Sequence, residues 1–394
     1  MRKLDEYIST QGKLLRCGYT TGTCAAAGTR AATDLLLGGS APATLSVDTP
    51  SGIRVELDVE EASHGDGWAQ CAVRKDAGDD PDVTDGVLVR ARVSLRTHRG
   101  IHIDGGAGVG HVTKEGLDQP PGSAAINTIP RSMIEREARR AASEHDYDGG
   151  LNIRISIPGG EELAAHTFNP RLGIEGGLSV LGTTGIVRPM SEAALVESLQ
   201  LELRVAYAQG TTETLLVPGN YGKAFAQTEL GIPAERAVTC SNYVGAALDE
   251  AARLGFEAVL LVGHVGKLVK VAAGAMNTHS RMADGRAETV AAHAALAGAT
   301  HGVIEAIFEA PTTEAMLDLL CQEGLLEPTM ASLAHKLSEH LRFRAGNNMR
   351  VEAIMFSNKH GLLCGTAGAD KLVERLARPA GASSIEEQSN PRGQ

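Results

Sequence analysis

The sequence predicts a two-domain protein of mixed α/β class. An N-terminal α+β domain with a mostly antiparallel sheet precedes a C-terminal Rossmann-like parallel α/β domain. The first observation is length, because 394 residues with a 43% hydrophobic share exceed what one ordinary core holds. The second is that short runs of alternating apolar and polar residues fill residues 43–104. The third is that strand-like and helix-like runs alternate after residue 210.

The boundary between the two domains is expected in a glycine-rich stretch between Asn169 and Pro189. We therefore place the α+β domain at residues 1–185 and the Rossmann-like domain, with a cofactor site, at residues 186–377. The remaining residues, 378–394, are polar and rich in Ser, Pro and Gly, which predicts a disordered tail.

The first domain opens with a loop that leads into a helix near Thr21 and Thr23. The following run, CAAAGTRAATDLLL, consists largely of strong helix formers, and Gly38 and Gly39 end it. A second helix is predicted after Pro130. The strand candidates are TLSVDT, IRVELDV, AQCAVRK, VLVRARVSL and, after the second helix, LNIRISI.

The second domain starts with a helix over residues 191–208, for which Ser191 is a suitable N-cap. The next strand candidates are TLLVPGN, AVTCS and AVLLVG, and the helix candidates between and after them are GKAFAQTEL, VGAALDEAARLGF and KLVKVAAGAM. Such alternation is typical of βαβ units around a parallel sheet. Residues 300–345 are helical by pattern, and VEAIMFS is predicted as a last strand.

Composition excludes several classes of function. The net charge of −11 argues against a general nucleic-acid binder, and an aromatic share of 3% offers few platforms for stacked bases. No signal peptide is visible, and no apolar run reaches the about 18 residues of a membrane span. We expect a soluble, cytoplasmic protein with neither nucleic acid nor membrane as partner. A homo-oligomer is left open.

Cysteines and histidines do not form a metal-binding pattern. The six cysteines include no CxxC pair, and they are expected to be reduced thiols. The histidines form no HExxH motif or other spaced ligand set. We therefore expect no metal site in the protein itself.

Three polar loops follow the three strands predicted at the start of the parallel sheet. Because ligands of open parallel sheets bind at the carboxyl ends of the strands, these loops should lie together at one edge. Each loop alone is also compatible with a simple tight turn. The cofactor-binding candidates are Gly219, Asn220, Tyr221, Gly222, Ser241, Asn242 and Gly263.

Other polar residues are candidates for holding an anionic ligand. Hydroxyls at a helix start suit an anion, although they are equally compatible with an N-cap. Two arginines in the glycine-rich stretch could pair with carboxylates or hold the domain junction. Asp104–Gly110 is either another anion loop or a flexible hairpin connection. The substrate candidates are Thr20, Thr21, Thr23, Arg171, Arg188, Lys267 and Asn277.

Taken together, the loops give the chain a specific resemblance over most of residues 16–290. It resembles the cobalt-precorrin-5B C(1)-methyltransferase family, CbiD, in the stretches RCGYTTGTCAAAGTRAA, GGAGVGHVTKEGL, AAINTIPRSMI, NPRLGIEGGLSVLGTTGIVRPMS, VPGNYG, SNYVGAALDEAARLGF and VGHVGKLVKVAAGAMNTHSRMADGRAE. The resemblance implies methyl transfer from S-adenosyl-L-methionine to C-1 of a corrin precursor in anaerobic cobalamin biosynthesis. Any cobalt would arrive inside the substrate.

In-line methyl transfer from a sulfonium depends mainly on alignment, and the sequence shows no nucleophile–base constellation. If a base assists, the candidates are His264 and His279. Two other classes remain open: a nicotinamide-dependent reductase and a non-catalytic tetrapyrrole carrier. The reductase is disfavoured because Ser241 and Asn242 stand where a dinucleotide site usually has an acidic residue.

Overall fold

The structure is a computed structural model that describes residues 2–10 and 12–378. It confirms the mixed α/β class, with thirteen α-helices and several sheets among the described residues. The described residues divide into two compact units, with the division between Glu192 and Ala193. The predicted disorder of residues 378–394 falls, except for Arg378, outside the described residues.

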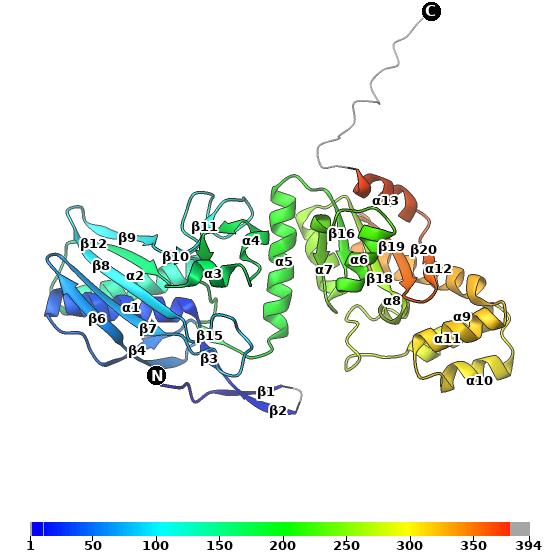
Figure 1. Ribbon diagram of the computed structural model, residues 1–394, viewed down its shortest axis with the longest axis horizontal. Coiled ribbons are helices and arrows are strands. Elements are labelled where there is room, and N and C mark those ends of the chain that lie inside the picture. Colours follow the sequence, from blue (N-terminus) through cyan, green and yellow to red (C-terminus); the bar gives the residue numbers. More distant parts are fainter. Residues whose placement is uncertain (1, 11, 379–394) are drawn as a thin grey trace, which may run out of the picture. The chain divides into compact units, whose positions relative to one another are not determined.

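The first unit is built on a five-stranded sheet (Figure 1). Its strand order is β6 (Glu60–Gly65), β7 (Trp68–Arg74), β8 (Leu88–Arg96), β12 (Gly150–Ser156) and β9 (Gly100–Gly105). All neighbours are antiparallel except β12 and β9, which run parallel. Two separate hairpins pair β1 (Tyr7–Thr10) with β2 (Lys13–Arg16) and β4 (Thr44–Asp48) with β5 (Arg54–Asp58).

Two helices, α1 (Thr21–Gly38) and α2 (Thr128–Glu144), form the core of this unit with the sheet. α1 ends as predicted, because Gly39 adopts the left-handed conformation (φ 78°) that glycine accepts at no steric cost. Its small side chains let it approach the sheet closely: a Cβ on Gly28 would lie 3.3 Å from the Ala91 methyl.

The glycine-rich segment Asp104–Gly110, predicted as an anion loop or a flexible hairpin connection, contains the end of β9 and one short strand. Gly108 and Val109 form β10, which pairs parallel with β14 (Gly177–Leu178) and is buried. A Cβ on Gly108 would lie 1.8 Å from the Ile157 carbonyl oxygen. Only glycine therefore lets the backbone at position 108 approach the backbone at Ile157 this closely. The other short elements here are β3 (Gly18–Tyr19), β11 (His111–Val112), α3 (Gly160–Ala164), α4 (Asn169–Leu172), β13 (Ile174–Glu175) and β15 (Ile186–Val187).

The second unit contains the predicted parallel sheet. The strand order is β17 (Ala237–Thr239), β16 (Glu213–Val217), β18 (Ala258–His264), β19 (Arg350–Ser357) and β20 (Gly361–Gly365). The first four strands are parallel, and β20 runs antiparallel to β19. Numbered from β16, the order is 2-1-3-4-5, a doubly wound order that differs from the 3-2-1-4-5-6 order of dinucleotide-binding sheets. The order in which strands are added reverses between β16 and β18, because β17 lies on one side of β16 and β18 lies on the other.

Helices cover both faces of this sheet because successive strand residues point to opposite sides. Leu215 and Val217 pack with α6 (Asn220–Thr228) and α13 (Ala369–Ala377). Leu216 lies in the core on the other face. That core holds α5 (Glu192–Ala208), α7 (Val244–Leu254), α8 (Val265–Ala272), α9 (Arg286–Leu296), α10 (His301–Glu309), α11 (Thr313–Gln322) and α12 (Leu326–Ala345).

The predicted last strand VEAIMFS is confirmed as β19, and the helical region over residues 300–345 as α10–α12. β20 and α13 were not predicted. None of the described helices has the length and apolar character needed to cross a bilayer.

Candidate functional site

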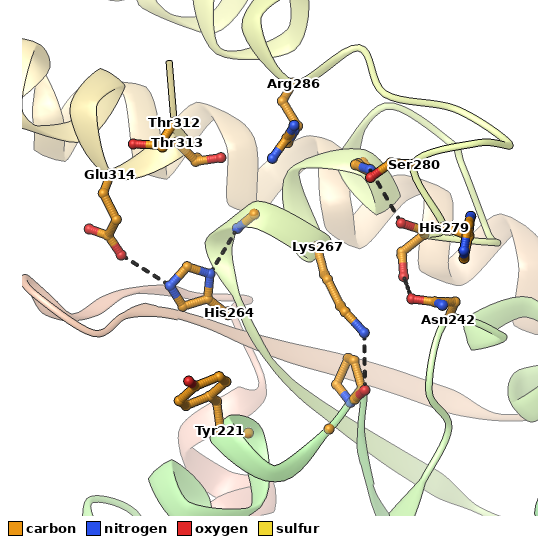
Figure 2. A pocket seen from close by; sticks show the side chains of 16 residues that line it. Tyr221, Asn242, His264, Lys267, His279, Ser280, Arg286, Thr312, Thr313 and Glu314 are labelled. Atoms are coloured by element: carbon orange, nitrogen blue, oxygen red, sulfur yellow. Dashed lines mark hydrogen bonds and ion pairs between the residues drawn. The ribbon is translucent and has the colours of Figure 1, made fainter. Parts of the chain in front are cut away.

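A cavity of about 520 Å³ opens where β16 and β18 end, at the reversal of strand order (Figure 2). The loop after β16 contributes Pro218 and Gly219, and the end of β18 contributes His264. The loop after β17 contributes Asn242. A cavity of this size is in the range of small-molecule sites, and the edge is the one at which open parallel sheets bind ligands.

The structure brings part of the predicted set together at this cavity. The predicted residues that line it are Gly219, Tyr221, Gly222, Asn242, His264, Lys267 and His279. Asn220 begins α6 beside it, and Ser241 precedes Asn242 in a left-handed conformation (φ 51°). Gly263 lies in β18, where a Cβ would come within 2.9 Å of the Leu268 side chain. Its lack of a side chain therefore allows close packing against Leu268 of α8.

His264 has both ring nitrogens engaged. Its Nδ1 accepts a hydrogen bond from the Gly266 backbone N–H at 3.2 Å, which makes His264 the N-cap of α8. An accepting Nδ1 carries no proton, so the Nε2–H donates to Glu314 Oε1 at 3.0 Å. Glu314 Oε2 accepts in turn from the Ser357 hydroxyl at 2.6 Å. The geometry selects one neutral tautomer and leaves it no lone pair for a substrate proton.

His279, like His264, accepts a hydrogen bond at Nδ1 from the backbone N–H two residues further along the chain. Its Nδ1 accepts from the Arg281 N–H at 3.2 Å, so its neutral ring carries a proton on Nε2. Asn277 holds this turn, because its side-chain oxygen accepts from the His279 N–H at 3.0 Å. Asn242 ties the turn to the sheet edge by accepting at Oδ1 from the Thr278 hydroxyl at 3.2 Å. His279 thus presents a donor at the cavity wall.

Three cations line the cavity: Lys267, Lys270 and Arg286. Lys267 Nζ donates to the Pro218 carbonyl at 3.1 Å, and burial lowers the pKa of this lysine. Burial also lowers the pKa of Lys270, whose Nζ donates to the Thr278 carbonyl at 3.3 Å. Arg286 forms a double hydrogen bond with Asp284 at 2.6 and 2.9 Å.

The sequence did not predict that the start of α11 forms part of the cavity wall. Thr312, Thr313 and Glu314 all line the cavity, and Thr312 is the N-cap of the helix. Pro-Thr-Thr-Glu is a recognisable helix start, but nothing in the sequence links it to a strand fifty residues earlier. Thr313 is 4% exposed, and its hydroxyl has no hydrogen-bond partner in the described part of the chain.

The threonine candidates of the first unit are buried and bonded within that unit. Thr20 Oγ1 accepts from the Thr23 N–H at 3.3 Å as the N-cap of α1. The Thr23 hydroxyl donates to the Gly185 carbonyl at 2.7 Å, and the Thr21 hydroxyl donates to the Leu181 carbonyl at 3.3 Å. The helix start therefore docks onto residues 181–185, and its hydroxyls are used in that contact.

The arginine candidates are on the surface of the first unit. Arg171 lies in α4 and Arg188 follows β15, and both side chains are exposed. Across residues 2–10 and 12–378, no group of three His, Cys, Asp or Glu side chains is placed to hold a metal ion.

Two family profiles match the chain. The profile described as CbiD matches residues 8–189, and the profile described as CbiD, C-terminal domain, matches residues 277–367. A protein named cobalt-precorrin-5B C(1)-methyltransferase from Ruminiclostridium cellulolyticum is 44% identical over 95% of this chain and 99% of its own length. A protein of that name from Photorhabdus laumondii is 44% identical over 93% and 96%. The crystal structure of the cobalamin biosynthesis protein CbiD from Archaeoglobus fulgidus is 30% identical, covering 70% of this chain and 86% of its own, with a TM-score of 0.38.

Proposed function

The chain belongs to the CbiD family, and on that basis we propose that it is a C-methyltransferase that methylates C-1 of cobalt-precorrin-5B in cobalamin biosynthesis. Its methyl donor is S-adenosyl-L-methionine, which supplies an electrophilic methyl group on a sulfonium. The second unit, which is Rossmann-like, contains the binding site for this donor. The protein works in the cytoplasm on a small tetrapyrrole, without a nucleic-acid or membrane partner.

The observation that carries the proposal is the position of the cavity at the reversal between β16 and β18. Gly219 lets a ligand approach the backbone, since a Cβ there would meet nothing within 4 Å. The unpartnered Thr313 hydroxyl and the cations fit a donor with polar and carboxylate groups. Candidate donor contacts are Gly219, Asn220, Tyr221, Gly222, Ser241 and Asn242, with Gly263 supporting them from behind.

We assign His264 and His279 positioning and hydrogen-bonding roles in this reaction. Since each Nδ1 accepts a backbone N–H, neither neutral ring offers a lone pair as a ready base. His264 keeps the ends of β18 and α11 together, whereas His279 offers its Nε2–H to a ligand. The rate then depends on alignment of donor and acceptor rather than on a basic side chain. The substrate contacts that we propose are Arg171, Arg188, Lys267 and Asn277. Thr20, Thr21 and Thr23 are not among them, because their buried hydroxyls are bonded within the first unit.

Calorimetric titration with S-adenosylhomocysteine and, separately, with NADH tests the assignment. Saturable binding of the nucleoside and transfer of a labelled methyl group to cobalt-precorrin-5B are expected. Binding of NADH without S-adenosylhomocysteine would favour a nicotinamide-dependent reductase. Binding of the tetrapyrrole with neither nucleoside and without methyl transfer would favour a carrier.

A further inference from the structure

The cavity is walled by the beginnings of four helices. First-turn residues of α6 (Tyr221 and Gly222), α8 (Lys267), α9 (Arg286) and α11 (Thr313) all line it. The first N–H groups of a helix have no intrahelical acceptor, and the helix dipole places partial positive charge there. Four such ends around one cavity favour a negatively charged ligand.

The charged side chains add to this positive field. The carboxylate of Glu314 is already bonded to His264 and Ser357. Asp284 pairs with Arg286, and it lies 3.9 Å from Lys270. Arg286 and Lys270 are thus partly neutralised, whereas Lys267 forms no ion pair with any carboxylate of the described residues.

Lys267 is therefore a half-buried cation that is incompletely satisfied. Its ammonium group has three donors, and one of them reaches the Pro218 carbonyl. A buried charge is costly unless it is paired, and a carboxylate in the cavity would supply the missing partner. The buried Thr313 hydroxyl beside Gly266 has no hydrogen-bond partner among the described residues.

We propose that Lys267, supported by Lys270, Arg286 and the four helix ends, forms a carboxylate-binding subsite in this cavity. The proposal rests on the proposed function, because both substrates of that reaction carry carboxylates. The carboxylate comes either from the amino-acid end of the methyl donor or from the rim of the tetrapyrrole.

The test is a cycle of ligand and protein changes measured by calorimetry. The ligand pair is S-adenosylhomocysteine and its decarboxylated analogue, which keeps the amine. The proteins are wild type, Lys267→Met, Arg286→Met and the control Lys371→Met, which removes the charge of an exposed lysine on α13. A porphyrin octacarboxylate is titrated into the same proteins, and thermal melting checks that each variant folds.

If the bound carboxylate belongs to the methyl donor, Lys267→Met lowers the affinity for S-adenosylhomocysteine about tenfold. The affinity for the decarboxylated analogue then stays nearly unchanged. With the tetrapyrrole as the source, the porphyrin loses affinity and S-adenosylhomocysteine does not. Arg286→Met lowers the affinity for the same ligand as Lys267→Met does, and Lys371→Met leaves the affinities for both carboxylate ligands unchanged.

The subsite would be overturned if Lys267→Met lowered the affinities for S-adenosylhomocysteine and its decarboxylated analogue equally and left the affinity for the porphyrin unchanged. It would also be overturned by a wild type that binds neither carboxylate ligand. Failure of the proposed function looks different: wild type then binds no S-adenosylhomocysteine, whatever Lys267→Met does to the porphyrin.

Discussion

His264 Nε2 lies 3.0 Å from Glu314 Oε1, across a separation of fifty residues. This bond joins the carboxyl end of β18 to the first turn of α11, and Ser357 at the end of β19 bonds the other Glu314 oxygen. One carboxylate thus fixes two adjacent strand ends and a helix end beside the cavity.

Glu314→Ala should lower the free energy of unfolding by about 2 kcal/mol, since two donors lose a charged acceptor. Glu314→Gln keeps an acceptor for the His264 Nε2–H and should cost less. Urea denaturation measures both, and nitrogen NMR of His264 reports the tautomer. Equal losses in the two variants would mean that the bond to His264 contributes little.

Gly219, the N-cap of α6, and Gly222, in its first turn, should respond differently to substitution. Gly222→Ala places a Cβ 2.7 Å from the Val262 carbonyl oxygen, so α6 must shift away from β18, at a cost of about 1–3 kcal/mol. Gly219→Val should leave the melting temperature unchanged, because its backbone is extended (φ 168°) and its surroundings are open. Calorimetry should nevertheless show weaker binding of S-adenosylhomocysteine, and unchanged affinity would remove Gly219 from the proposed donor site.

The affinity for a carboxylate ligand should depend on pH through Lys267. Burial lowers its pKa below 10.5, Cys240 opposes this, and nearby Lys270 adds to it. Burial raises the pKa of Cys240 to about 12, so that group stays a neutral thiol over the range concerned. As pH rises through the lowered pKa, Lys267 loses its charge and affinity falls, earlier than for an exposed lysine.

Lys267→Arg provides the matched control for that titration. Arginine keeps its charge over the accessible range, so the affinity of this variant should decline less between pH 7 and pH 10. Parallel calorimetric titrations of the two proteins make the comparison. A decline of the same size in both would place the titrating group elsewhere.

The buried ion pair of Arg16 and Asp76 should govern the acid stability of the first unit. Their side chains are 14% and 4% exposed, and the second guanidinium bond measures 2.8 Å. Burial opposes ionisation of Asp76, but bonds from Arg16 and from the Gly78 N–H leave its pKa below the usual value. Asp76→Asn should cost about 3 kcal/mol, because it leaves the arginine unpaired.

The sign of the pH effect follows from the lowered pKa. The folded state binds the Asp76 proton more weakly than the unfolded chain, so the stabilisation is complete above the unfolded pKa. It is lost as pH falls through the folded pKa. Chemical unfolding between pH 7 and pH 3 should therefore show a smaller acid-induced loss in Asp76→Asn than in wild type. Equal losses would contradict this role.

The positions of the three loop-bearing strands could be predicted from the sequence. Apolar runs ending at Val217, Thr239 and Gly263 identify strands, and alternation with helices implies that they are parallel. The carboxyl ends of parallel strands share one edge, so the meeting of Gly219, Asn242 and His264 follows from local pattern and a general rule. The helix from Thr21 to Gly38 could also be predicted, because helix propensity and termination by glycine depend on the local sequence.

Only the tertiary structure decided what these residues bond to. Glu314 reaches His264 because α11 packs in the core on one face of the sheet, and no local pattern encodes a partner fifty residues away. The threonine hydroxyls of the first unit face residues 181–185, and Gly108 lies against the Ile157 carbonyl, for the same reason. Periodicity reports which face of an element is buried, whereas the identity of the buried partner depends on how distant elements pack.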